Sequence, residues 1–116
     1  MADSLNDLAR QLEQFAAERD WQQFHSPKNL ASALVVEAGE LLEHFQWLTE
    51  AQSRALPPEK LDAVAGEVAD VLLYLVQMAT ALRIDPVAAA QAKLQRNAQR
   101  YPVDLARGNS KKHSEL

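Results

Sequence analysis

Apolar residues recur through most of the chain at intervals of three and four positions, the spacing that gathers them on one face of an α-helix. Two such stripes predict helices over residues 4–20 and 27–49. The second is preceded by Ser26 and begins with Pro27, residue types that are typical of the start of a helix. No segment alternates apolar and polar residues as a half-buried β-strand does. The pattern therefore predicts an all-α protein.

Two more helices are predicted over residues 58–82 and 86–99, and each of them also begins with a proline. With four helices, the expected architecture is a four-helix bundle. After residue 101 the chain is rich in glycine, asparagine, serine and lysine, a composition typical of a mobile terminus. We therefore expect one helical domain over residues 1–101 and a flexible basic tail over residues 102–116.

The composition is that of one folded domain, with 116 residues of which 47% are hydrophobic and 24% charged. The absence of cysteine excludes disulfides, thiolate metal sites and thiol nucleophiles, and it favours a cytoplasmic location. Because no unbroken run of 18 apolar residues occurs, we expect no membrane helix. The net charge of -4 makes the protein a poor platform for nucleic acid, so we expect no nucleic-acid partner either.

An acidic pattern repeats between the second and third predicted helices. Glu37 and Glu40 in one helix correspond to Glu67 and Asp70 in the next. The members of each pair are three residues apart, so they share a helix face at the edge of the apolar stripe. If the two helices pack antiparallel, four carboxylates converge and raise one another's pKa. A divalent cation would compensate the repulsion, and carboxylate oxygens suit Mg²⁺ or Mn²⁺.

Two other interpretations of the acid pairs stay open, a solvated helix face and an interface. The first is disfavoured because no Lys or Arg lies three or four positions from any of the four acids. A di-iron site of the kind found in helix bundles is also disfavoured, because the chain contains no Glu-x-x-His motif. The acids therefore indicate magnesium rather than iron.

The fourth predicted helix carries a basic face. Lys93, Asn97 and Arg100 follow one another at intervals of four and three residues, so two cations flank an amide on one side. This face suits phosphate oxygens. A solvated basic surface near a helix C-terminus is the competing interpretation.

Aromatic residues flank the second predicted helix, with Trp21 before it and Trp47 near its end, and Tyr74 lies in the third. Each can stack on a nucleotide base or belong to the core, and the sequence leaves both possibilities open. His25 is isolated, which favours a role in local packing or hydrogen bonding.

Four segments resemble a known family in order and spacing: Phe15–Asn29, Glu37–Trp47, Glu67–Val76 and Arg100–Arg107. The acid pairs on successive helices resemble the signature of the MazG-like superfamily. The members of this superfamily are all-α nucleoside triphosphate pyrophosphohydrolases. The four segments together resemble its dCTP pyrophosphatase branch.

The resemblance implies roles for individual residues. The implied Mg²⁺ ligands are Glu37, Glu40, Glu67 and Asp70. The implied phosphate-binding residues are Lys93, Asn97, Arg100 and Tyr74. The implied base-binding residues are Trp21, Trp47 and His25. One position departs from the branch, because Leu12 stands where its vertebrate members carry a pocket histidine.

The resemblance also implies Mg²⁺-dependent hydrolysis of a nucleotide, dCTP or a modified dCTP, to the monophosphate and pyrophosphate. Glu37 or Glu40 would take the proton of the attacking water. The alternatives are a pyrophosphohydrolase of the same fold for dUTP or a phosphoribosyl nucleotide, and a non-catalytic helical interaction module.

The third predicted helix is apolar on almost every side, with Val68 and Leu75 on one side and Leu73 and Val76 on another. Such a helix must be covered from several directions. We therefore expect a homo-oligomer, at least a dimer, and the resemblance implies a tetramer built as a dimer of dimers.

Overall fold

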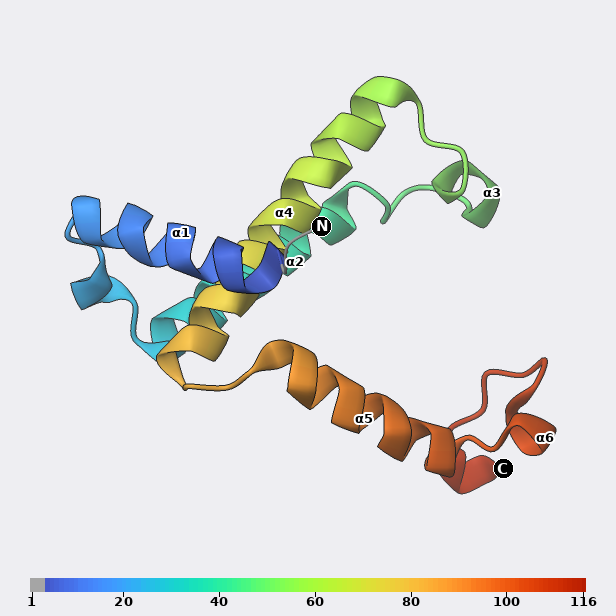
Figure 1. Ribbon diagram of the computed structural model, residues 1–116. Coiled ribbons are helices and arrows are strands. Elements are labelled where there is room, and N and C mark those ends of the chain that lie inside the picture. Colours follow the sequence, from blue (N-terminus) through green and yellow to red (C-terminus); the bar gives the residue numbers. More distant parts are fainter. Residues whose placement is uncertain (1–3) are drawn as a thin grey trace. The chain divides into compact units, whose positions relative to one another are not determined.

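The structure is a computed structural model that describes residues 4–116 (Figure 1). The chain divides into two units, one that ends at Arg83 and one that spans Ile84–Leu116. Every regular element in the described part of the chain is helical, so the predicted all-α class is confirmed. The division falls after the third predicted helix, whereas the sequence suggested a boundary at residue 101.

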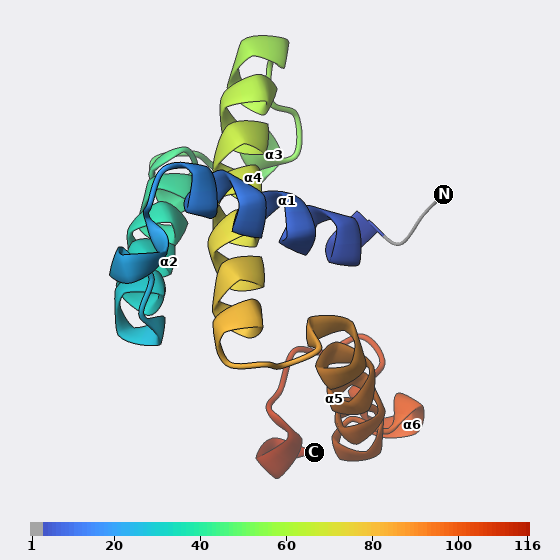
Figure 2. The same cartoon turned by 60° about the vertical axis from the view of Figure 1, so that its left-hand side comes forward.

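Residues 4–83 of the first unit form four α-helices and one 3₁₀ turn. They are α1 (Ser4–Glu18), the 3₁₀ turn (Gln22–Phe24), α2 (Pro27–Glu43), α3 (Glu50–Ser53) and α4 (Pro58–Ala81). Helices α2 and α4 lie side by side and run in opposite directions, and α1 packs across α4 (Figures 1 and 2). The antiparallel arrangement is the one that the repeated acid pairs required.

Helix α2 begins where the sequence predicts, and its first turn is capped. The Ser26 side chain accepts a hydrogen bond from the backbone N–H of Asn29 at 3.1 Å, and Pro27 occupies the first helical position. Such a cap satisfies one of the backbone donors that a helix leaves unpaired at its start. Helix α4 begins with Pro58 in the same way.

The predicted end of the second helix at residue 49 is wrong, because α2 ends at Glu43. The apolar periodicity continues past this point, but Thr49 begins another helix. Its hydroxyl accepts a hydrogen bond from the N–H of Gln52 at 3.1 Å, and its own N–H donates to the Gln52 side chain at 2.9 Å. This capping box holds Thr49 in an extended conformation, which a helix cannot continue through.

Helices α1 and α4 also end slightly before the predicted residues. Asp20 follows the end of α1 with φ 55, and Arg83 follows the end of α4 with φ 56. A residue in the left-handed region terminates a right-handed helix. The two helices therefore end at Glu18 and Ala81.

The core of the first unit is small. Its buried apolar residues are Ala16, Leu30, Val64, Val76 and Ala79, contributed by α1, α2 and α4. Leu30 is the most enclosed, with 2% of its surface exposed. Other large apolar side chains on α2 and α4 point away from this core, among them Val35, which is 70% exposed. Exposed apolar faces of this kind are typical of protein surfaces that meet a partner.

Helix α4 is long and apolar enough to cross a membrane by length and composition alone, which the sequence analysis did not expect. The core helix of a soluble protein meets the same criteria. Helix α4 packs against both α1 and α2, and it carries Glu67 and Asp70 near its middle. Both features fit a helix inside a protein assembly.

The second unit contains α5 (Pro86–Arg100), α6 (Val103–Ala106) and a 3₁₀ turn (His113–Glu115). Helix α5 is capped by Asp85, whose side chain accepts hydrogen bonds from the N–H groups of Val87 and Ala88, both at 3.1 Å. It extends one residue beyond the predicted end. The predicted tail thus contains two short helical segments, while its flexibility stays a prediction.

Candidate active site

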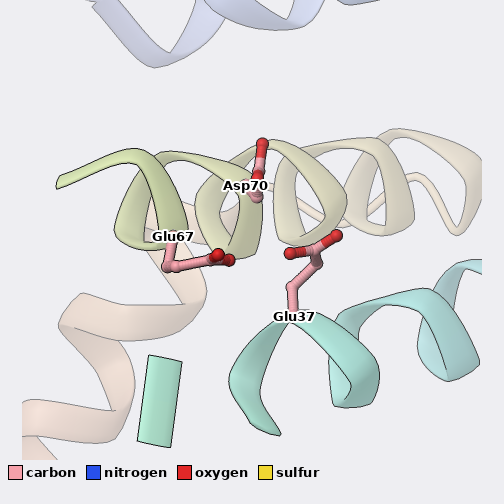
Figure 3. A group of neighbouring side chains, drawn as sticks. All are labelled: Glu37, Glu67 and Asp70. Atoms are coloured by element: carbon pink, nitrogen blue, oxygen red, sulfur yellow. The ribbon is translucent and has the colours of Figure 1, made fainter. Parts of the chain in front are cut away.

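Three carboxylates of the first unit converge between α2 and α4. Glu37 from α2 and Glu67 and Asp70 from α4 each offer one oxygen, and these oxygens lie within 4.8 Å of one another. Figure 3 shows the carboxylates of Glu37 and Glu67 turned toward each other across the gap between the helices. The antiparallel packing of two helices with the same acidic spacing produces this cluster.

The fourth predicted acid, Glu40, lies one turn after Glu37 on α2 and is half-buried. It is not a member of the group of three oxygens, although its side chain contacts Glu37. The structure therefore brings three of the four predicted ligands together and leaves the fourth at the edge of the cluster.

Burial raises the pKa of Glu37, and the neighbouring carboxylates of Glu67 and Asp70 raise it further. Contact with Glu37 raises the pKa of Glu40. Two carboxylates can form a hydrogen bond only when one of them holds a proton, so close contact between acids favours their protonated forms. The cluster is therefore electrostatically strained in the absence of a cation.

Two oxygens of the cluster have no hydrogen-bond partner within residues 4–116. They are the Oε2 atoms of Glu37 and Glu67, and both are buried. The ion pairs of the described chain involve other acids, namely Asp7, Glu18 and Glu50. Buried acceptors normally have a partner, and unpaired hard oxygen atoms are the ligands that divalent cations such as Mg²⁺ prefer. The residues present thus fit a metal ion.

A cavity of about 330 Å³ adjoins the acid cluster. Glu37 and Asp70 line it together with three of the residues predicted to contact nucleotide, Trp21, His25 and Tyr74. The cavity is mostly apolar, as ligand sites usually are, and it has a few polar groups that converge. One cavity therefore combines candidate metal ligands with aromatic rings that can meet a base.

The Trp21 ring is held by its neighbours. It packs edge to face on Phe15, with 5.7 Å between the ring centroids, and the Arg19 guanidinium lies 3.6 Å from the Phe15 centroid on α1. Phe15 also lines the cavity, a role that the sequence analysis did not predict for it. The Phe15–Trp21 pair thus gives the cavity an aromatic wall.

The structure does not bring Trp47 to this cavity. The side chain lies in the irregular segment that follows α2 and is 87% exposed. The predicted helix that was to carry Trp47 together with Glu37 and Glu40 ends before Trp47, at Glu43. A contact between Trp47 and the base stays a prediction.

The predicted phosphate-binding residues lie in the second unit. Lys93, Asn97 and Arg100 are all on α5, where their spacing places them on one face. Asn97 is half-buried, and the two cations are exposed. Their contact with phosphate stays a prediction.

Gln77 on α4 was not predicted as a site residue. It lines the cavity and has a buried amide oxygen without a partner among the described residues. The available signal was one amide within the apolar stretch that follows Asp70. A single polar residue in a helix is ordinarily a surface position, so the signal was weak.

The fold and the site define an all-α protein with a carboxylate cluster suited to a metal ion beside an aromatic-lined cavity. The model of the MazG-like family matches residues 33–116, and the chain belongs to this family.

Its relatives include dCTP pyrophosphatase 1 of Mus musculus, which is 48% identical over 97% of this chain and 68% of the relative. The corresponding protein of Homo sapiens is 46% identical over the same shares. A crystal structure of a pyrophosphatase from Archaeoglobus fulgidus superposes with a TM-score of 0.76 and 34% identity, covering 88% of this chain and 95% of that one. The resemblance noted in the sequence is therefore confirmed.

Proposed function

We propose that the protein is a nucleoside triphosphate pyrophosphatase that hydrolyses dCTP, or a base-modified dCTP, to the monophosphate and pyrophosphate. Relatives that are 44% to 48% identical to it over 115 residues are named dCTP pyrophosphatase 1. The structural observation that supports the proposal most strongly is the cluster of Glu37, Glu67 and Asp70, whose oxygens lie within 4.8 Å beside a cavity that Trp21 also lines.

Glu37, Glu67 and Asp70 would hold Mg²⁺, with Glu40 at the edge of the cluster. The bound ion would supply charge neutralisation of the triphosphate and a lowered pKa for the attacking water. Glu37 or Glu40 accepts the proton of this water. The water oxygen forms a bond to phosphorus, the link between the α- and β-phosphates breaks, and pyrophosphate leaves.

The remaining site residues bind and orient the substrate. The Trp21 ring stacks on the base, and Phe15 holds that ring in place. Tyr74 lines the same cavity and lies on α4 one turn after Asp70. Its proposed role is to bind the phosphates of the nucleotide. Lys93 and Arg100 would stabilise the charge that develops on pyrophosphate.

The protein also acts as a homo-oligomer under this proposal. The small core and the exposed apolar faces of α2 and α4 support at least a dimer. A tetramer built as a dimer of dimers is the proposed assembly, and the cytoplasm is its proposed location.

The proposal is tested by measuring pyrophosphate release from a panel of dCTP, 5-methyl-dCTP, dUTP, dTTP and a phosphoribosyl nucleotide, with Mg²⁺ and with EDTA. Asp70→Asn removes a candidate metal ligand, and Asp62→Asn removes the same charge from an exposed position of α4. We expect Mg²⁺-dependent turnover of dCTP that Asp70→Asn abolishes and Asp62→Asn retains. Preference for another nucleotide would contradict the substrate, and a fully active Asp70→Asn protein would contradict the metal site.

A further inference from the structure

Gln77 lies in the wall between two cavities. One is the cavity of about 330 Å³ beside the acid cluster, and the other has a volume of about 310 Å³. Four side chains line both of them, namely Leu12, Ala16, His25 and Gln77. Leu12 and Ala16 are apolar. Hydrogen bonding at this shared wall therefore depends on His25 and Gln77.

The Gln77 amide is poorly satisfied in the structure. Its Oε1 atom is buried and has no hydrogen-bond partner within residues 4–116. Buried acceptors are rarely left without a partner, because removing them from water without a new hydrogen bond is unfavourable. Rotation about the last side-chain torsion of glutamine is soft, so a small turn presents the oxygen to a group in the cavity. The amide is thus poised to accept a hydrogen bond from a ligand.

The position of Gln77 matches the base end of a nucleotide. Asp70, Tyr74 and Gln77 occupy one face of α4 at intervals of four and three residues, and all three line the larger cavity. At 1.5 Å per residue, Gln77 lies about 10 Å along the helix axis from Asp70. A deoxyribose and a pyrimidine bridge a separation of this order, so a nucleotide whose phosphates meet the acids places its base near Gln77.

The orientation of the amide decides which base edge it pairs with. Cytosine presents an amino donor beside a ring-nitrogen acceptor, whereas uracil and thymine present a carbonyl beside a ring N–H. An amide whose oxygen faces the amino donor and whose NH₂ faces the neighbouring acceptor pairs with the first pattern, as glutamine pairs with the similar edge of adenine. The same amide turned by 180° pairs with the second pattern, so the atom that faces the base decides the preference. At Gln77 the buried atom without a partner among the described residues is the oxygen, which fits the amino group of cytosine. We propose that Gln77 is a specificity-determining residue whose side-chain oxygen accepts a hydrogen bond from the exocyclic amino group of cytosine. This inference rests on the proposed nucleotide substrate.

The test compares binding of the non-hydrolysable α,β-imido analogues of dCTP and dUTP by titration calorimetry in Mg²⁺, with turnover of dCTP measured in parallel. Gln77→Met keeps the length of the side chain and removes its hydrogen bonding. Gln77→Glu keeps the acceptor. Gln14→Met is the matched control, because Gln14 lies on α1 outside both cavities and binds Glu18 at 3.0 Å.

We expect Gln77→Met to weaken binding of the cytosine analogue by about 2- to 12-fold, the range for one net hydrogen bond. Binding of the uracil analogue should change less, so the preference for cytosine falls. Gln77→Glu should retain the preference, and Gln14→Met should change neither affinity. Gln77→Met should also melt at a higher temperature without ligand, because it removes an unpaired buried atom.

An unchanged preference in Gln77→Met would overturn the inference, as would a wild-type protein that binds both analogues equally. A different result would contradict the proposed function. A protein that binds the cytosine analogue selectively through Gln77 but hydrolyses no dCTP would contradict the proposed activity and support the role of Gln77.

Discussion

Replacing Glu67 with glutamine should stabilise the metal-free protein, and it should abolish the rise in melting temperature that Mg²⁺ causes. In the wild-type protein Glu67 faces Glu37 across the gap between α4 and α2 (Figure 3), and each has a buried oxygen that finds no partner among residues 4–116. The glutamine amide can donate a hydrogen bond to the Glu37 carboxylate. The substitution therefore replaces a repulsive contact with an attractive one and removes a metal ligand at the same time.

The size of the effect follows from the contact that is exchanged. A hydrogen bond to a charged group contributes roughly 1.5 to 3 kcal/mol to stability. For a chain of this length, 1 kcal/mol corresponds to a change of about 4 °C in the melting temperature. We therefore expect Glu67→Gln to melt about 6 to 12 °C higher than the wild-type protein in EDTA.

Differential scanning calorimetry in EDTA and in Mg²⁺ measures both halves of this prediction. A free Mg²⁺ concentration of about a hundred times the dissociation constant adds about 2.7 kcal/mol to the free energy of unfolding of a protein that binds the ion only when folded. Mg²⁺ should therefore raise the melting temperature of the wild-type protein by about 11 °C. Glu43→Gln, which removes a charge from the exposed end of α2, should respond to Mg²⁺ as the wild type does. A Glu67→Gln protein that melts at a lower temperature than the wild type in EDTA would show that Glu67 and Glu37 do not repel each other. A Glu67→Gln protein whose melting temperature rises as much in Mg²⁺ as that of the wild type would show that Glu67 is not a metal ligand.

Three further predictions concern pH, the base and assembly. Because the pKa values of Glu37 and Glu40 are raised, the folded metal-free protein holds more protons than the unfolded chain. Its free energy of unfolding should therefore fall as pH rises from 4.5 through the raised pKa values. Urea titrations in EDTA should show a smaller fall for Glu37→Gln, and an equal dependence on pH in both proteins would count against the interaction among these carboxylates. Trp47→Ala should raise KM about five- to a hundredfold with little change in kcat if this ring stacks on the base, whereas steady-state kinetics with unchanged KM would remove it from the base site. Val35→Glu should dissociate the assembly while Ser32→Glu on the same helix does not, as light scattering would show, and an active wild-type monomer at micromolar concentration would contradict the assembly.

The starts of the helices were predictable because their signals are local. Ser26 with Pro27, and Asp85 with Pro86, form caps that depend only on neighbouring residues, and the structure contains both. The end of α2 has no comparable glycine or proline signal. Thr49 and Gln52 have the spacing of a capping box, which is a sequence signal that a new helix begins there. The continuing apolar periodicity extended the predicted helix past this signal.

The acid cluster was predictable for a different reason. Its residues repeat on two helices, so a single assumption about how those helices pack brings Glu37, Glu67 and Asp70 together. Gln77 has no partner in the sequence pattern, and its importance depends on which side chains enclose a cavity. The position of Trp47 depended on the length of α2, so the wrong helix end carried over to this residue.

The most direct test of the proposed activity is the identity of the products formed from dCTP, followed by ³¹P NMR in Mg²⁺ and in EDTA. We expect dCMP and pyrophosphate in equal amounts, formed only when Mg²⁺ is present, because the carboxylate cluster needs a cation to bind the triphosphate. Formation of dCDP and inorganic phosphate, or turnover that continues at the same rate in EDTA, would contradict the proposed activity.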